Sequence, residues 1–237
     1  MAMRIEEFGG LTCRVSGDAD GDSPVVVLLH GFGAPGDDLV PLADWIPTPD
    51  GTRYVFPEAP LELGGLYGDS RAWWMIDLAS LERGADRAGE VPDGLAPARA
   101  RVMALLDDVR DQLGVPDERV VLGGFSQGAM LTVDVVLATE RAFAGAVLLS
   151  GTLLAERVWA PRMAARAGLR VFQSHGRHDG LLPFRGAERL RDQLRGAGWR
   201  VDWRPFDGSH EIPAVVLDEV GGFLGEVLDG ATVPSPG

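Results

Sequence analysis

Residues 119–130, RVVLGGFSQGAM, contain the pattern that decides the fold of this chain. An apolar run of strand length leads into two glycines and Ser126, and residues 127–139 continue as a segment that is apolar nearly all round. This order predicts a buried strand, a sharp turn at Ser126 and a buried helix, the setting of a nucleophile elbow. The flanking glycines would let strand and helix approach closely, and the helix N-terminus favours negative charge beside the hydroxyl. A serine that only caps the helix is the alternative interpretation.

Further apolar runs of strand length lie on both sides of this stretch. They are rich in β-branched and aromatic residues, and their continuous apolarity is typical of strands buried on both faces of a parallel sheet. The predicted strands are 25–29, 54–56, 120–122, 146–149, 169–172 and 201–203. A helical stripe in 97–113 ends at Gly114-Val115-Pro116. Strands that alternate with helices predict an α/β fold, with a mostly parallel central sheet and helices on both faces.

The whole of 1–228 is predicted to be one domain, since α/β architectures of this length are commonly single. Residues 57–96 interrupt the alternation with several glycines and prolines and the pair Trp73-Trp74, so they are predicted to be an irregular insertion near the functional site. Residues 229–237 are small and polar with two prolines, and are predicted to form a flexible tail.

Composition excludes several classes of protein. The 237-residue chain carries a formal net charge of −13, which argues against binding to nucleic acid or to an anionic membrane surface. Its one cysteine, Cys13, excludes an intrachain disulfide framework and any multi-cysteine metal site, and its alternating apolar surroundings predict that it is buried. No basic region precedes an apolar run at the N-terminus, and the apolar runs are far shorter than the ~20 residues of a membrane helix. A cytoplasmic protein without membrane insertion is therefore expected.

A nucleophilic serine needs a base, and the base needs an orienting carboxylate. Among the four histidines, His210 follows the last predicted strand, where an α/β sheet would bring a base to Ser126. Asp179, just beyond the strand 169–172, is the favoured carboxylate, and Asp207 is the rival. The order Ser126, Asp179, His210 is the nucleophile–acid–base order of α/β-hydrolases.

Such chemistry also needs two donors for the oxyanion. The backbone N–H after the nucleophile, that of Gln127, would supply one, and the loop after an early strand supplies the other. His30-Gly31-Phe32-Gly33 is such a loop, and the donor there would be the amide of Phe32.

These motifs together resemble the phospholipase/carboxylesterase family of serine hydrolases, to which the acyl-protein thioesterases belong. The likeness covers residues 22 to 228 and rests on LLHGFG at 28–33, RAWWMID at 71–77, RVVLGGFSQGAM at 119–130, SHGRHDGLLP at 174–183 and GSHEIP at 208–213. The resemblance implies an α/β-hydrolase fold, the same triad and oxyanion donors, and an acyl pocket lined by the region of Trp73 and by Leu181. It implies no metal or cofactor, and leaves a homodimer open. Unlike the animal thioesterases, the chain has Ala129 where they carry another glycine.

The sequence thus predicts a serine carboxylesterase that hydrolyses short- to medium-chain esters through an acyl-enzyme, with thioesters and lysophospholipids as further acyl substrates. The expected partner is a small-molecule acyl ester. Two alternatives remain: an amidase or peptidase with the same triad, and a catalytically silent scaffold that serves as a small-molecule receptor.

Overall fold

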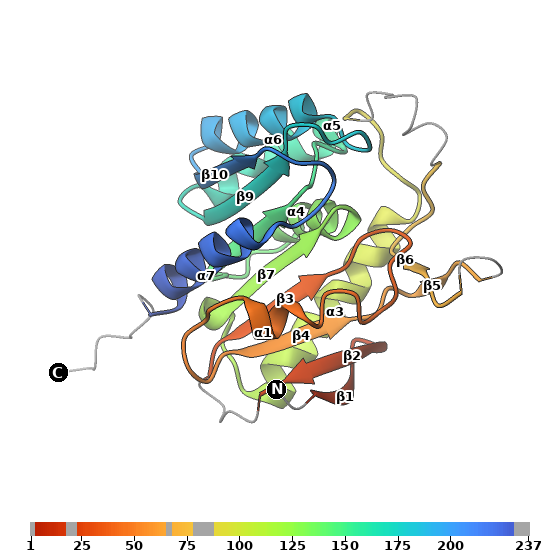
Figure 1. The fold of residues 1–237 in the computed structure, drawn as a ribbon, viewed down its shortest axis with the longest axis vertical. Helices are drawn as coiled ribbons and strands as arrows, with labels where there is room; N and C mark the ends of the chain where they lie inside the picture. The colour runs from red at the N-terminus through yellow and green to blue at the C-terminus, as the bar shows by residue number, and fades with distance from the viewer. Residues whose placement is uncertain (1–2, 18–22, 65–67, 78–87, 230–237) are drawn as a thin grey trace.

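The central element is a twisted eight-stranded sheet (Figure 1), seen in a computed structural model that describes residues 3–17, 23–64, 68–77 and 88–229. The strands lie in the order β1-β2-β4-β3-β7-β8-β9-β10. Their bounds are β1 Met3–Phe8, β2 Leu11–Ser16, β3 Val25–Leu29, β4 Arg53–Pro57, β7 Val120–Phe125, β8 Gly145–Leu149, β9 Arg170–Gly176 and β10 Arg200–Phe206. Six neighbouring strands are mutually parallel, as predicted: β4, β3, β7, β8, β9 and β10.

The N-terminal end of the sheet is antiparallel. β1 and β2 form a hairpin, and β2 pairs antiparallel with β4. The alternation around Cys13 predicted burial of this residue, which is confirmed because its side chain is fully buried in β2. Burial also raises the pKa of the Cys13 thiol to about 12, so the thiol stays protonated at neutral pH.

Helices cover both faces of the sheet, as predicted (Figure 1). Four helices share one apolar core against the first face: α3 Leu95–Leu113, α4 Gln127–Ala138, α5 Glu156–Met163 and α6 Phe184–Gly196. The short α1, Leu42–Trp45, and the C-terminal α7, Ala214–Asp229, pack on the other face in a second core. Short 3-10 turns, Asp117–Arg119 and Ala164–Arg166, precede β7 and follow α5.

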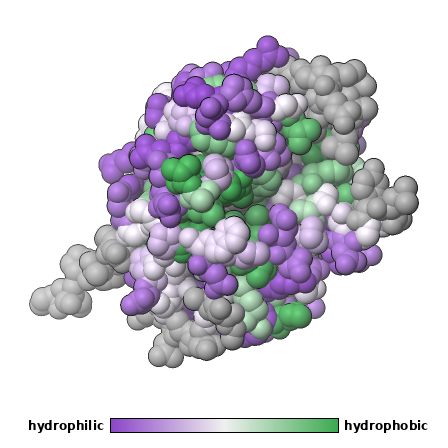
Figure 2. Space-filling view, in the orientation of Figure 1, coloured by the Kyte–Doolittle hydropathy of each residue, from purple (hydrophilic) through white to green (hydrophobic). Residues whose placement is uncertain are grey.

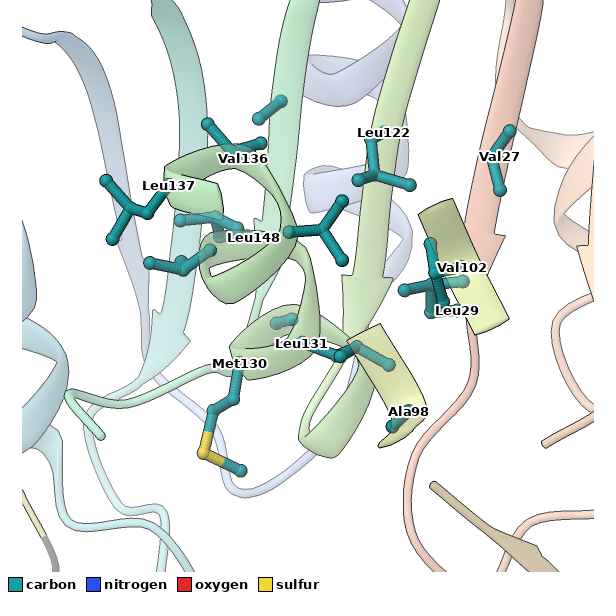
Figure 3. Packing of buried hydrophobic residues seen from close by; sticks show 14 of the residues in the cluster. Val27, Leu29, Ala98, Val102, Leu122, Met130, Leu131, Val136, Leu137 and Leu148 are labelled. Atoms are coloured by element: carbon teal, nitrogen blue, oxygen red, sulfur yellow. The ribbon is translucent and has the colours of Figure 1, made fainter. Parts of the chain in front are cut away.

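Helix α4 is buried along nearly its whole length, as its apolar sequence predicts. Figure 3 shows Leu131 of α4 among side chains of the sheet and of α3, including Leu122 of β7 and Val102 of α3. Its one carboxylate, Asp134, accepts hydrogen bonds from Arg99 and from the indole N–H of Trp159, each at 2.8 Å. Covered on all sides, α4 is a rigid support for Ser126 at its N-terminus.

The segment 57–96 contains little regular structure in the residues that are described. A two-stranded ribbon, β5 Leu61–Glu62 with β6 Arg71–Ala72, lies apart from the main sheet. Part of the predicted insertion (65–67 and 78–87) and most of the predicted tail (230–237) lie outside the described residues, whereas Asp229 ends α7. Within the described ranges, no helix has the length and apolarity needed to cross a membrane.

Candidate active site

Ser126 occupies the sharp turn between β7 and α4. Its backbone lies at φ 55° and ψ −114°, a conformation that L-residues rarely adopt and that costs on the order of 1–3 kcal/mol. The Ser126 N–H donates to the carbonyl of Leu149 at 2.8 Å, which fixes the turn to the neighbouring strand β8. The strained turn places the hydroxyl at the carboxyl edge of the sheet, where the α4 N-terminus begins.

Three glycines make this turn sterically possible. A Cβ on Gly128 would lie 2.0 Å from the carbonyl oxygen of Leu29, and one on Gly124 would lie 2.5 Å from the carbonyl carbon of Gly128. A Cβ on Gly31 would lie 3.3 Å from the Cβ of Ser126. The first turn of α4 therefore packs directly on the end of β3 and on the 30–33 loop.

His210 is brought to Ser126 by a turn that follows β10. The amides of Arg177 and His178 donate to the carbonyls of Phe206 and Gly208, both at 2.9 Å, so the two loops are joined along their backbones. A side chain at Gly176 would prevent this contact, because its Cβ would lie 2.1 Å from the Ser209 carbonyl oxygen. The carboxyl ends of β9 and β10 thus hold the predicted acid and base together.

The three predicted triad residues form a continuous hydrogen-bonded chain. His210 Nε2 lies 2.9 Å from Ser126 Oγ, and His210 Nδ1 lies 2.6 Å from Asp179 Oδ2. Since a carboxylate accepts, Nδ1 carries the hydrogen and Nε2 is free to accept from the serine hydroxyl. The Phe125 ring, 4.8 Å from the imidazole by ring centroids, packs beside His210.

Asp179 is held ionised in a buried position. Burial alone would raise the pKa of its carboxyl, but hydrogen bonds from His175, His210 and the Leu182 amide hold this pKa well below its usual range. Its Oδ1 accepts from the amides of Leu181 and Leu182 at 2.9 and 2.8 Å. The rival, Asp207, is 87% exposed and pairs with His178 instead.

The predicted oxyanion donors lie at the two loops that meet at Ser126. The amide of Gln127 is the first of α4, and the first amides of a helix have no intrahelical acceptor. Neither this N–H nor that of Phe32 has an acceptor among the described residues. Both amides are therefore available to a negatively charged oxygen beside Ser126.

His30 organises the Phe32 side of this arrangement, a role that the sequence did not reveal. The Ala59 amide donates to His30 Nε2 at 3.0 Å, so the ring hydrogen is on Nδ1, which donates to the Gly31 carbonyl at 2.8 Å. Burial lowers the pKa of the His30 imidazole, which keeps the ring neutral. The Gly31 carbonyl and the Phe32 N–H belong to one planar trans peptide and point in opposite directions. By fixing the carbonyl, His30 fixes the direction of the Phe32 N–H.

The Gln127 side chain links α4 to the segment after β6. Its Oε1 accepts from the Trp73 amide at 2.9 Å, and its Nε2 donates to the Trp74 carbonyl at 2.8 Å. The Trp73 indole N–H donates to the His30 carbonyl at 3.0 Å. A glutamine at the start of a largely apolar helix is the sequence signal that could have indicated these bonds.

A cavity of about 140 Å³ opens beside Ser126 and His210. Leu181, predicted as a pocket residue, lines it, and its other apolar lining comes from Phe32, Ala34, Ile76, Phe125 and Leu182. Trp73, the other predicted pocket residue, is not in this lining. It is buried in the core and held by hydrogen bonds to His30 and Gln127. Ile76 of the same segment lines the cavity instead.

The cavity also has one acidic side chain, Asp38, which the sequence did not single out. On the face seen in Figure 2, apolar surface gathers near the middle and hydrophilic surface predominates around it. Among the described residues, no group of histidine, cysteine and carboxylate side chains is arranged to hold a metal ion.

Comparisons with known proteins match this chain over most of its length. The model of the phospholipase/carboxylesterase family matches residues 12–228. Acyl-protein thioesterase 1 of Eremothecium gossypii is 28% identical over 231 residues, 94% of this chain and 95% of that protein. Acyl-protein thioesterase 1 of Cryptococcus neoformans var. neoformans serotype D is 30% identical over 173 residues, 71% of each protein.

Solved structures agree with the fold. The crystal structure of esterase PE8 is 29% identical in sequence, with a TM-score of 0.77 over 92% of this chain and 99% of that one. The carboxylesterase from Mesorhizobium loti has the same TM-score at 20% identity, over 94% of this chain and 99% of that one, and supports the fold alone. The predicted α/β-hydrolase fold is confirmed.

Proposed function

The chain belongs to the phospholipase/carboxylesterase family, and from this we propose that it is a serine carboxylesterase acting on short- to medium-chain carboxylic esters. It is a carboxylic ester hydrolase by its family and its relatives. The names of those relatives make thioesters a second acyl substrate to test. The proposed partner is a small-molecule acyl ester.

The observation that carries the proposal is the hydrogen-bonded chain from Ser126 through His210 to Asp179. His210 Nε2 accepts the serine proton as Oγ attacks the ester carbonyl carbon, and Asp179 stabilises the imidazolium that forms. The carbonyl oxygen becomes an oxyanion that accepts from the amides of Phe32 and Gln127. Removing one such donor typically costs 10²–10³ in kcat, so each amide is worth roughly 3–4 kcal/mol.

The second half of the reaction uses the same residues. His210 gives its proton to the leaving alcohol or thiol, which leaves the acyl group as an ester of Ser126 Oγ. His210 then accepts a proton from a water molecule as that water attacks the acyl carbon. Collapse of this second tetrahedral intermediate frees the carboxylic acid and returns the proton to Ser126.

The cavity supports the limit on chain length. At about 140 Å³ the cavity is well below the ~300–1,000 Å³ of pockets that enclose drug-sized ligands. Its lining of Phe32, Ile76 and Leu181 suits an apolar chain. A long acyl chain would have to extend beyond the cavity, over the surface.

The test is hydrolysis of p-nitrophenyl esters from acetate to palmitate by the wild type and by Ser126→Ala. We expect activity that peaks at short or middle chains and is lost in the variant, with thermal unfolding unchanged. A variant that retains most of the activity would refute the assignment of Ser126. A peak at palmitate would contradict the chain-length proposal and favour a lipase.

Two parallel measurements separate the alternative functions. A matched anilide hydrolysed as fast as its ester would favour an amidase. Absence of labelling of Ser126 by a fluorophosphonate, together with absence of ester turnover, would favour a silent receptor scaffold, because the probe reacts with an activated serine.

A further inference from the structure

His175 is a fully buried histidine that the proposed mechanism does not use. It lies near the end of β9, four residues before Asp179. Its Nε2 is 3.2 Å from Asp179 Oδ2, the same oxygen that lies 2.6 Å from His210 Nδ1. The catalytic carboxylate oxygen thus faces two imidazole rings.

The surroundings of His175 define its protonation. Nε2 is 2.8 Å from the carbonyl oxygen of Leu182, which can only accept, so the ring hydrogen is on Nε2. Nδ1 is buried and has no partner among the described residues. The Nε2–H therefore donates to the Leu182 carbonyl and also lies beside Asp179 Oδ2, with 3.2 Å between the heavy atoms.

These contacts close a small ring of interactions around the carboxylate. Leu182 donates its N–H to Asp179 Oδ1 at 2.8 Å, and its carbonyl accepts from His175, which also reaches Oδ2. One residue of the loop and one residue of β9 therefore hold both oxygens. The carboxylate cannot rotate without breaking contacts at each of them.

We propose that His175 is a positioning residue for Asp179, whose Nε2–H fixes Oδ2 opposite His210 Nδ1 and shares the negative charge of that oxygen. This inference rests on the proposed function, because His175 acts through the triad. A residue that only filled space in the core would leave the charge of Asp179 unaffected. His175 instead offsets part of the negative charge on Asp179, so that less of this charge is available to stabilise protonated His210.

Few other charges bear on this site. The titratable and charged groups that the described contacts place around His175 are Asp179, His210 and, beyond the Phe184 ring, Arg177. The register partner of His175 on β10 is Pro205. The pair His178–Asp207 lies on the same loops but is largely exposed, so solvent screens it.

The test compares His175→Gln, whose amide N–H can replace Nε2–H, with His175→Leu, which has no donor. His178→Leu is the control for loss of a nearby exposed histidine. For each folded protein, kcat/KM for a neutral p-nitrophenyl ester is measured against pH. Loss of a hydrogen bond to a charged group predicts a fall of about 10- to 100-fold in His175→Leu. The acidic limb of the kcat/KM–pH profile of His175→Leu should also move to higher pH. In this variant the full charge of Asp179 stabilises the imidazolium of His210.

His175→Gln should keep the position of the acidic limb and most of the activity, and His178→Leu should behave as the wild type. Equal losses in His175→Gln and His175→Leu with an unmoved limb would show a structural role only and overturn the proposal. So would wild-type behaviour of His175→Leu.

A measurement on the wild type decides the matter even where a variant fails to fold. Side-chain ¹H–¹⁵N NMR of the folded wild type should show that His175 carries a hydrogen on Nε2. Observation of a ring that carries its hydrogen on Nδ1 alone would overturn the proposal. Failure of the proposed function is distinct, because it would appear as a wild type without Ser126-dependent esterase activity.

Discussion

The Gln127 side chain offers a strong test of how the N-terminus of α4 is held. Replacing Gln127 by Met keeps a similar volume and leaves the backbone N–H of residue 127, the proposed oxyanion donor, in place. The change removes both side-chain partners of the segment after β6, the acceptor for the Trp73 amide and the donor to the Trp74 carbonyl. Both tryptophans are almost fully buried, so water cannot replace these bonds.

The expected loss follows from the two orphaned backbone groups. A buried donor or acceptor without a partner costs about 1–3 kcal/mol, so Gln127→Met should lower the free energy of unfolding by about 2–6 kcal/mol. Domains have total stabilities of about 5–15 kcal/mol, so the loss is readily measured by urea unfolding followed by tryptophan fluorescence. Since no contact with substrate is removed, kcat/KM of the folded variant should fall by less than about tenfold, or 1.4 kcal/mol.

Gln173→Met is the matched control. Gln173 is also fully buried, but only its Nε2 has a partner, the Ala187 carbonyl at 2.9 Å, whereas its Oε1 has none among the described residues. Its replacement should cost about 1 kcal/mol, because one bond is lost and one unsatisfied oxygen is removed. A Gln127→Met variant that is no less stable than Gln173→Met would refute the reasoning.

Four further expectations follow from the site. Asp179→Asn should lower kcat by about 10⁴, because the amide can stabilise the wrong tautomer of the base, and steady-state ester hydrolysis measures this. The same substitution should remove part of the acid sensitivity of the fold. Because the pKa of Asp179 is depressed, its ionised form contributes stability that is complete above the unfolded pKa of ~3.9 and is lost as the pH falls below that value towards the folded pKa. The urea midpoints of the wild type and the variant should therefore differ by a constant amount above about pH 5 and begin to converge only below about pH 4. His30→Leu should lower kcat by up to about 10²–10³ by releasing the Gly31 carbonyl, whereas His30→Asn, which can keep the donor, should lose less; equal losses would contradict the assigned role. Asp38→Asn should favour anionic over cationic esters in kcat/KM relative to the wild type, whereas Asp37→Asn, outside the cavity lining, should leave this ratio unchanged.

The parallel part of the sheet could be predicted from the sequence because its strands are apolar on both faces. The run 25–29 coincides with β3, and the predicted strand 201–203 lies within β10. The predicted strands 120–122, 169–172 and 201–203 stop short of the carboxyl ends of β7, β9 and β10, where residues such as Ser174 and His175 are polar but buried. The candidate site lies at these strand ends, so a search for apolar runs detects them less well than the rest of each strand.

The antiparallel hairpin of β1 and β2 was not predicted as strands. Its sequence mixes charged and apolar residues, and β2 pairs with residues of β4 that lie 40 to 44 positions further along the chain. The same limit applies to the site: motif order indicated Ser126 and His210, but nothing local indicates that the Gln127 side chain meets Trp73. Such contacts are set by how α4 and the segment after β6 pack together.

The turn at Ser126 shows why the motif around it is informative. Positive φ is often the reason for a glycine, yet in this turn it falls on the serine, and Gly124 and Gly128 have ordinary φ values. Their lack of a side chain is required by distance instead, because a Cβ on Gly128 would meet the carbonyl oxygen of Leu29. A pair of glycines around a strained serine therefore indicates two structural requirements. One is a turn that presents the hydroxyl, and the other is a helix packed against the neighbouring strand. A serine that only caps a helix needs neither, which is why the five residues 124–128 discriminate so well between the two interpretations.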